Sequence, residues 1–248
     1  MATDSSITSK TPEDFSFCIV VPMYNEASNA KACVDKLSSF LKELDYKTAL
    51  IVTNDGSTDD TWSVLQGLQA QNDNLLLENH EVNQGYGAAN VTGAVRARQE
   101  NFKYVLFMDA DLTQDCKYIY PFIDLMKQDI DFIKATRYAD GGDTEGVSFG
   151  RRIISRVGNI IAQIFLPLPI TDYTNGFRAI KSDILAQITA EERGFAYLIE
   201  EVNKASKIVK TYAEVPYTLT VREDEFSESK FVYSPKVYLT YLKWVFKR

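Results

Sequence analysis

Histidine and cysteine are scarce in this chain of 248 residues, and their scarcity excludes several kinds of site. The one histidine is His80, and the three cysteines, Cys18, Cys33 and Cys116, are unevenly spaced. Disulfide frameworks and zinc sites need closely set cysteines, in the zinc case often with histidines. We therefore expect neither, and the chain fits a reducing compartment. We interpret His80 as a structural or loop residue rather than a catalyst.

An excess of positive charge and long apolar runs are also missing. Lysine and arginine number 27 against 34 aspartates and glutamates, a formal net charge of -7. This balance argues against a surface built mainly for nucleic-acid phosphates. No apolar run approaches the ~20 residues that cross a bilayer, and the polar start at residues 1–10 has no signal-peptide core. We expect a soluble or membrane-peripheral chain that binds no nucleic acid.

The chain does have an alternation of strand and helix patterns. Residues 1–14, rich in Ser, Thr and Asp, are interpreted as a flexible leader. After them, short apolar runs typical of buried strands alternate with apolar residues at helical spacing. This alternation predicts an α/β fold with a mostly parallel central sheet flanked by helices. The expected strands are 15–21, 48–53, 74–78, 104–108 and 131–136, and the expected helices are 26–44, one that includes 62–68, 88–100 and 118–127.

The second half is less regular. Residues 138–150, rich in glycine and acids, predict a mobile loop over the site. The tail, 231–248, carries basic residues with Tyr and Trp at helical spacing and predicts a C-terminal amphipathic helix. Two interpretations of this helix stay open: it lies at a membrane interface, or it packs on the domain. Between loop and tail we expect helices over 151–166, 183–188 and 197–208 and strands over 177–180 and 211–221.

Two carboxylates, Asp109 and Asp111, follow the expected strand 104–108 and are separated by Ala110. Ligands of open α/β sheets bind at the carboxyl ends of the strands, where such a pair can hold a divalent cation against substrate phosphates. An Asp-x-Asp alone is more often a solvated turn. Its weight here comes from other segments that also follow strands.

Two further strand ends carry polar groups that suit a nucleotide. Residues 22–26 follow the first strand, and Asp55 with Gly56 follows the second, where Asp55 can accept from a base or ribose donor. For Ser57, Thr58 and Asp59 we favour turn and helix-capping roles. The Gly-x-Gly at residues 85–87 follows the third strand and lacks a third glycine, which argues against a dinucleotide-binding dehydrogenase. Ligand contact and close backbone packing both remain open for these glycines.

Taken in order, these segments resemble the motifs of family 2 glycosyltransferases with the GT-A (Rossmann-like) fold. Within that family the resemblance is greatest to polyprenyl-phosphate glycosyltransferases, the dolichyl-phosphate mannose synthase type. It covers residues 15–230 and is carried by residues 22–26, 55–59, 83–89, 109–111 and 172–178. It implies a single domain that inverts the anomeric carbon while moving a hexose (glucose or mannose class). The donor would be a nucleotide diphosphate-sugar and the acceptor dolichyl or undecaprenyl phosphate, at the cytoplasmic face of a membrane.

The resemblance also implies roles for individual residues. Mg2+ or Mn2+ would be held by Asp109 and Asp111, and a chain of negative net charge needs such a cation to approach a diphosphate. The catalytic set would add Arg137, Asp172 and Arg178 to these two aspartates. The donor would be bound by Pro22, Tyr24, Asn25, Glu26, Asp55, Asn83, Gly85, Asp109, Ala110 and Asp111, and the acceptor phosphate by Arg137, Arg151, Arg152, Arg156, Arg222, Ser229 and Lys230.

A phosphate acceptor changes what catalysis requires. The second ionisation of a phosphate monoester lies near pH ~6, so this nucleophile needs no protein base. A glycan hydroxyl would need one, for which Asp172 or Glu200 could serve. With either acceptor, these two carboxylates could instead hydrogen-bond the sugar or orient an Arg. Two alternatives therefore remain: a family 2 enzyme acting on a glycan hydroxyl, and a non-catalytic nucleotide-sugar binding module. The chain departs from the family in a longer stretch between Arg222 and Lys230, and a third metal ligand that some relatives supply would fall at Thr113, next to Gln114.

Overall fold

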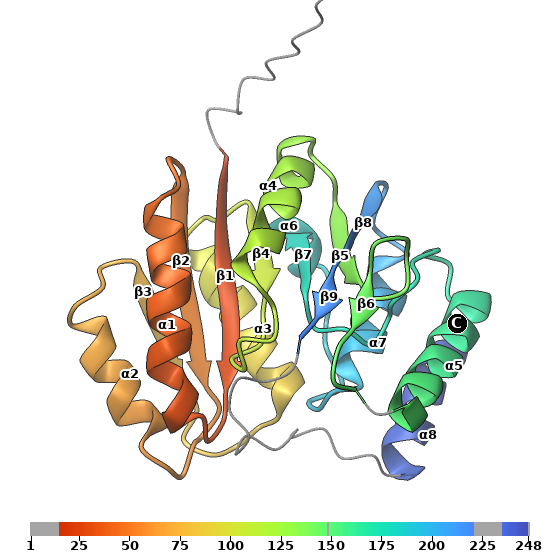
Figure 1. Ribbon diagram of the computed structural model, residues 1–248, viewed down its shortest axis with the longest axis horizontal. Helices are drawn as coiled ribbons and strands as arrows, with labels where there is room; N and C mark the ends of the chain where they lie inside the picture. Colours follow the sequence, from red (N-terminus) through yellow and green to blue (C-terminus); the bar gives the residue numbers. More distant parts are fainter. Residues whose placement is uncertain (1–14, 148, 221–234, 248) are drawn as a thin grey trace, which may run out of the picture.

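The computed structural model describes residues 15–147, 149–220 and 235–247 of the chain. Within them a seven-stranded sheet, in the order β3-β2-β1-β4-β7-β5-β8, is covered by helices on both faces (Figure 1). A two-stranded sheet pairs β6 with β9. In chain order the elements are β1 (Ser16–Met23), α1 (Ala27–Lys42), β2 (Lys47–Asn54), α2 (Thr61–Gln69), β3 (Leu75–Asn79), α3 (Tyr86–Gln99), β4 (Tyr104–Phe107), the 3-10 turn η1 (Cys116–Tyr118), α4 (Ile119–Lys127), β5 (Phe132–Thr136), β6 (Asp143–Thr144), α5 (Phe149–Phe165), β7 (Arg178–Lys181), α6 (Ser182–Leu185), α7 (Tyr197–Ala205), β8 (Tyr212–Pro216), β9 (Thr218–Leu219) and α8 (Pro235–Phe246).

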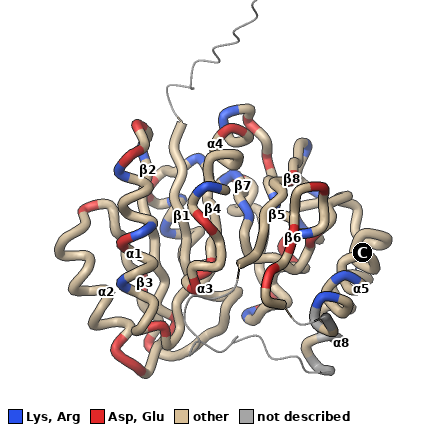
Figure 2. The backbone as a smooth tube through the Cα atoms, in the orientation of Figure 1, with Lys and Arg blue, Asp and Glu red and all other residues tan. Residues whose placement is uncertain are grey.

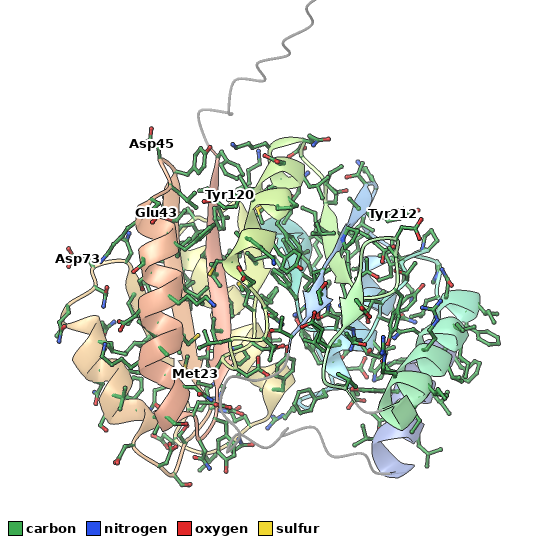
Figure 3. The ribbon with its side chains drawn as sticks, in the orientation of Figure 1. Met23, Glu43, Asp45, Asp73, Tyr120 and Tyr212 are labelled. Carbon is green, nitrogen blue, oxygen red and sulfur yellow. The ribbon has the colours of Figure 1, made fainter. Side chains whose placement is uncertain are left out.

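The first four strands of the chain form the parallel part of the sheet, as predicted. β1 lies between β2 and β4 and pairs with both in parallel, with Met23 opposite Asn54 and Val20 opposite Phe107. The carboxyl ends of these strands therefore meet at one edge of the sheet, the lower edge in Figure 3, where Met23 is labelled. Glu43 and Asp45 are labelled at the opposite edge.

Residues of β1 alternate between the two faces of the sheet. Phe17, Ile19 and Val21 pack in a core with residues of α1, α2 and α4. Cys18 and Val20 point to the other face and pack in a core that includes Ala97 of α3. Burial on both faces explains why the strand reads as one continuous apolar run rather than as an alternation.

The sheet is not parallel throughout. β7 runs antiparallel between β4 and β5, and β8 pairs in parallel with β5 at the edge. The strand at 177–180 was predicted, but its direction was not, because an apolar run carries no information on which neighbour it joins. The chain enters β7 from the edge that holds the strand ends, after passing through α5.

The second half builds a separate apolar core from α5, α6, α7, α8 and the strands β5 and β7. Trp244 of α8 is fully buried there, while Leu239 and Phe246 of the same helix remain 67% and 53% exposed. The C-terminal helix therefore packs on the domain by one face. No helix of the described residues is long and apolar enough to cross a membrane.

One local prediction is corrected. The described part of the 138–150 loop does not line the cavity, and it contains β6, which pairs with β9. The N-cap position of α2 is Asp60, whose side chain makes no cap bond, and the neighbouring Asp59 carboxylate accepts from the amides of Thr61, at the start of α2, and of Ala27, at the start of α1. The leader, 1–14, and the stretch from Arg222 through Ser229 and Lys230 lie outside the described residues, as does the Arg151 side chain.

Candidate active site

A cavity of about 990 Å³ opens at the edge where the parallel strands end. One side is polar and comes from the loops after β1, β2, β3 and β4. The other side is apolar and comes from α5, α7 and α8. Figure 1 shows α5 and α8 at the right of the sheet. Of the ten residues predicted to bind the donor, all but Asn25 line this cavity. Asn25, at φ 51°, instead joins two loops by accepting from the amide of Thr58.

Asp109 and Asp111 both face the cavity just beyond β4. The Asp109 carboxylate accepts from Tyr86 Oη at 3.2 Å and from Gln114 Nε2 at 2.8 Å. Asp111 Oδ1 accepts from the Thr113 hydroxyl at 2.7 Å. Thr113 and Gln114 therefore hold the two carboxylates in place. A Cβ at position 176 would lie 2.6 Å from Tyr86 Oη, so a side chain at this position would displace the Tyr86 hydroxyl.

The electrostatics of the pair fit a divalent cation. Burial, and after it the charge of Asp111, raises the pKa of Asp109 to about 6. A cation placed between the two carboxylates would relieve this repulsion. No cluster of three or more His, Cys, Asp or Glu side chains suited to a metal occurs in the described ranges. Two carboxylates without further protein ligands fit Mg2+ and its like, which keep waters and substrate phosphates as their remaining ligands.

Asp55 organises the loop that borders the polar side. Its carboxylate accepts from the amides of Gln84 and Gly85 at 2.9 and 2.8 Å and bonds to His80 Nδ1 at 2.7 Å. His80 Nε2 in turn lies 2.9 Å from the Thr92 hydroxyl. His80 thus has the structural role expected of it. The predicted contact of Asp55 with a base or ribose remains a prediction.

Arg137 follows β5 and lines the cavity. Its Nε and Nη2 donate to the two Asp172 oxygens at 2.7 and 2.9 Å, and Nη2 also donates to Thr174 Oγ1 at 3.1 Å. Burial disfavours the charged form of both side chains, but the charge and hydrogen bonds of the partner together have the larger effect on each. The pKa of Arg137 is therefore raised, and the pKa of Asp172 is lowered. Of the roles expected for Asp172, orienting an arginine is confirmed. The role of a base is corrected, because this carboxylate is fully buried and ion-paired and does not line the cavity.

Arg178 lies beneath the cavity rather than in it. Its guanidinium is fully buried, pairs through Nε and Nη2 with the Glu201 carboxylate, and donates from Nη1 to the Gly176 carbonyl at 2.7 Å. Because each of these nitrogens bonds away from the cavity, the predicted catalytic role of Arg178 is corrected to a supporting role. Glu200 is likewise structural, because it is fully buried and accepts from the amides of Glu191 and Glu192.

Two further arginines predicted to bind the acceptor, Arg152 and Arg156, are exposed on α5. Arg152 pairs with Asp143 at 2.9 Å, and Arg156 lies over the Tyr138 ring at 5.2 Å. Neither side chain lines the cavity. Two features of the site were not assigned from the sequence. The first is the pair Tyr86 and Gln114, which are polar and lie in or beside recognised motifs. The second is the apolar wall of the cavity, which is made by Ile153, Ile154, Val157, Ile161, Leu198, Ile199, Tyr241, Leu242 and Val245.

Curated relatives of this chain transfer sugars to lipid phosphates by name. A dolichol-phosphate mannosyltransferase of Pyrococcus furiosus is 28% identical over 233 residues, 92% of this chain. The chain spans only 62% of that relative's length. An undecaprenyl-phosphate mannosyltransferase of Micrococcus luteus is 25% identical over 85% of each chain. A polyprenol monophosphomannose synthase of Mycolicibacterium smegmatis is 25% identical over 83% of this chain and 77% of its own.

Solved structures confirm the fold. A glucosyl-3-phosphoglycerate synthase of Mycobacterium tuberculosis, solved with Mn2+, UDP and glucosyl-3-phosphoglycerate, superposes with a TM-score of 0.60 at 18% identity. The match covers 86% of this chain and 73% of that one. The sequence model of glycosyl transferase family 2 matches residues 18–189. That span covers most of the described sheet and all of its polar site loops, and the chain belongs to glycosyl transferase family 2.

Proposed function

We propose that the protein moves a hexose of the mannose class from a nucleotide diphosphate-sugar to a polyprenyl phosphate, with inversion at the anomeric carbon. The observation that supports this most is one cavity that joins the Asp109 and Asp111 carboxylates, the Arg137 guanidinium and an apolar wall. The two carboxylates suit a metal-bound diphosphate, and the guanidinium suits a phosphate monoester. The apolar wall suits an isoprenoid chain. The mannosyltransferase names of the relatives support the choice of sugar.

Asp109 and Asp111 would hold Mg2+ or Mn2+, which supplies positive charge against the departing diphosphate. Tyr86, Thr113 and Gln114 orient the two carboxylates before the donor arrives, so little reorganisation is needed on binding. The loop that Asp55 fixes borders the same side of the cavity and suits the nucleoside.

Arg137 is the group that we assign to the acceptor phosphate. Asp172 and Thr174 fix its Nε and Nη2 atoms, and among the described residues no hydrogen bond involves its Nη1. The guanidinium is therefore oriented while donors remain for a phosphate oxygen. That oxygen attacks C1 of the sugar, and the new C–O bond forms as the bond from C1 to the diphosphate breaks. The attacking oxygen is already anionic at neutral pH, so no protein group has to accept a proton.

The outer face of α5 and α8 supports attachment to a membrane surface, at its cytoplasmic side. On that face the two helices expose apolar side chains that do not line the cavity: Ile160, Ile164, Phe165, Leu239 and Phe246. An apolar patch of this kind on a soluble face marks an interaction site. Basic positions lie on the same helix α5 (Figure 2), and they suit anionic lipid headgroups. A polyprenyl chain could then pass from the bilayer to the apolar wall of the cavity.

The test is a product assay. The protein is incubated with Mn2+, a panel of GDP- and UDP-sugars and, as acceptors, a short-chain polyprenyl phosphate and oligosaccharides, and the products are analysed by mass. We expect a glycosylated lipid phosphate that disappears in Asp111→Asn and with a chelator, while the surface variant Asp35→Asn retains it. Transfer to a glycan hydroxyl alone would favour the first alternative, and donor binding without turnover would favour a binding module. Either result overturns the proposal.

A further inference from the structure

Residues 189–195, which we call the α6–α7 segment, lie directly on the start of α3. The amides of Gly87 and Ala88 both donate to the Arg193 carbonyl, at 2.6 and 3.2 Å. A Cβ on Gly85, at φ 104°, would lie 2.5 Å from that same oxygen, and one on Gly87 would lie 2.7 Å from the Glu192 carbonyl. The Gly-x-Gly thus serves a close backbone approach to this segment.

The segment also sets the position of Tyr86. Its residue Phe195 stacks on the Tyr86 ring, with centroids 4.7 Å apart and planes inclined by 19°. The hydroxyl of Tyr86 donates to Asp109 Oδ1. A shift of the α6–α7 segment would therefore move the group that holds one of the two site carboxylates.

The other end of the segment is fastened to α8. Glu192 Oε1 accepts from Trp244 Nε1 at 2.8 Å and from Lys243 Nζ at 2.9 Å. Trp244 is fully buried, and its carbonyl accepts from Asn203 Nδ2 at 2.9 Å, so this anchor is rigid. The same helix gives Tyr241, Leu242 and Val245 to the apolar wall. A second contact joins the exposed Lys247 Nζ to the Glu191 carboxylate at 2.9 Å. Glu192 is thus the polar link from the donor side of the cavity to the buried Trp244 on the acceptor side.

We propose that Glu192 is a positioning residue of the donor site: by tying the α6–α7 segment to Trp244, it keeps Tyr86 bonded to Asp109. The inference rests on the proposed function, because it takes Asp109 and Asp111 as the cation ligands. Glu192 does not line the cavity and acts through Phe195 and Tyr86. Its loss should weaken cation binding and raise KM for the sugar nucleotide, and should change kcat less.

The experiment is a double-mutant cycle on Mn2+ affinity, measured by calorimetry with GDP or UDP present. Glu192→Ala and Tyr86→Phe should each weaken Mn2+ binding by about 3- to 10-fold, as for one lost hydrogen bond. The double variant should bind Mn2+ with about the same affinity as the single variant that binds it less tightly, because both changes remove the same contact to Asp109. Glu192→Gln keeps an oxygen for Trp244 Nε1 and should recover most of the affinity. Asp35→Asn, on the exposed Lys31–Asp35 pair of α1, is the matched control.

The outcomes of the double-mutant cycle distinguish a failure of this inference from a failure of the proposed function. Additive effects of the two changes, or an unchanged Mn2+ affinity in Glu192→Ala, would overturn the positioning role even if that variant melts at a lower temperature. A wild-type protein that binds no Mn2+ with either nucleotide would overturn the proposed function and this inference together. Loss of Mn2+ binding in Asp111→Asn combined with an additive cycle would overturn the inference alone.

Discussion

At the scale of single residues, the site is also supported by side chains that do not line the cavity. Arg178 and Glu201 form a buried ion pair behind Asp109, and Lys134 is fully buried beside them, donating to the Asn175 carbonyl at 2.6 Å. Buried charges are costly unless each has its partner. Stability should therefore respond strongly to changes in this layer, even though it contacts no substrate.

Removing one member of the buried pair should destabilise the fold. Glu201→Ala leaves the Arg178 guanidinium buried without its carboxylate, and we expect the free energy of unfolding to fall by about 3–5 kcal/mol. Urea denaturation measures it. The double variant Arg178→Met with Glu201→Leu should regain much of the loss, and Asp35→Ala in an exposed pair should cost under about 1 kcal/mol. Equal effects of Glu201→Ala and Asp35→Ala would contradict the account.

Lys134 should make stability depend on pH. Burial, and after it the charge of Arg178, lowers its pKa from 10.5 to about 7. Between these values the unfolded chain binds a proton that the folded chain does not, so stability rises with pH, by at most about 1.4 kcal/mol per pH unit. Lys134→Met should flatten this rise when urea unfolding is compared at pH 7, 8 and 9. An equal slope in both proteins would show that Lys134 keeps its proton when folded.

At the scale of elements, packing decides which glycines can be replaced. A Cβ on Gly87 of α3 would lie 2.6 Å from Tyr197 Cβ and 2.7 Å from a carbonyl oxygen, whereas one on Gly67 of α2 would meet nothing within 4 Å. We expect Gly87→Ala to destabilise by about 1–3 kcal/mol through overpacking, and Gly67→Ala to stabilise by about 0.5–1 kcal/mol through helix propensity. Thermal melts of both variants check the contrast, and the same sign for both would refute it.

The exposed apolar face of α5 should decide membrane binding separately from the cavity. Ile160 and Ile164 are 49% and 69% exposed and do not line the cavity. Changing both to Asp should weaken cosedimentation with anionic phospholipid vesicles at least about 10-fold, because burying each isoleucine is worth about 1.5–3 kcal/mol. Val95→Asp, an exposed change on α3, is the control. Undiminished vesicle binding in the double variant would rule out this face as the docking surface.

At the scale of the whole molecule, the sequence predicts what periodicity and local chemistry determine. The strands, the helices and the parallel half of the sheet could be predicted because each apolar run is local. Nearly all the residues predicted to bind the donor could be placed at the cavity, because they lie at the ends of the strands or in the loops that follow them. The direction of β7, the burial of Arg178 and the joining of α8 to the α6–α7 segment depend on contacts between distant residues. Arg178 and Trp244 illustrate this. Arg178 was predicted to be catalytic, and the helix of Trp244 was left open between a membrane interface and packing on the domain, but both side chains are buried.

In the proposed function, donor and acceptor bind in one cavity, with a cation at Asp109 and Asp111. The most direct measurement is a crystal structure with Mn2+ and a nucleoside diphosphate, in which anomalous scattering locates the metal. We predict Mn2+ at about 2.1 Å from an oxygen of Asp109 or Asp111 and from the diphosphate, on the side of the cavity that Arg137 faces. Mn2+ and diphosphate bound away from both carboxylates would contradict the account.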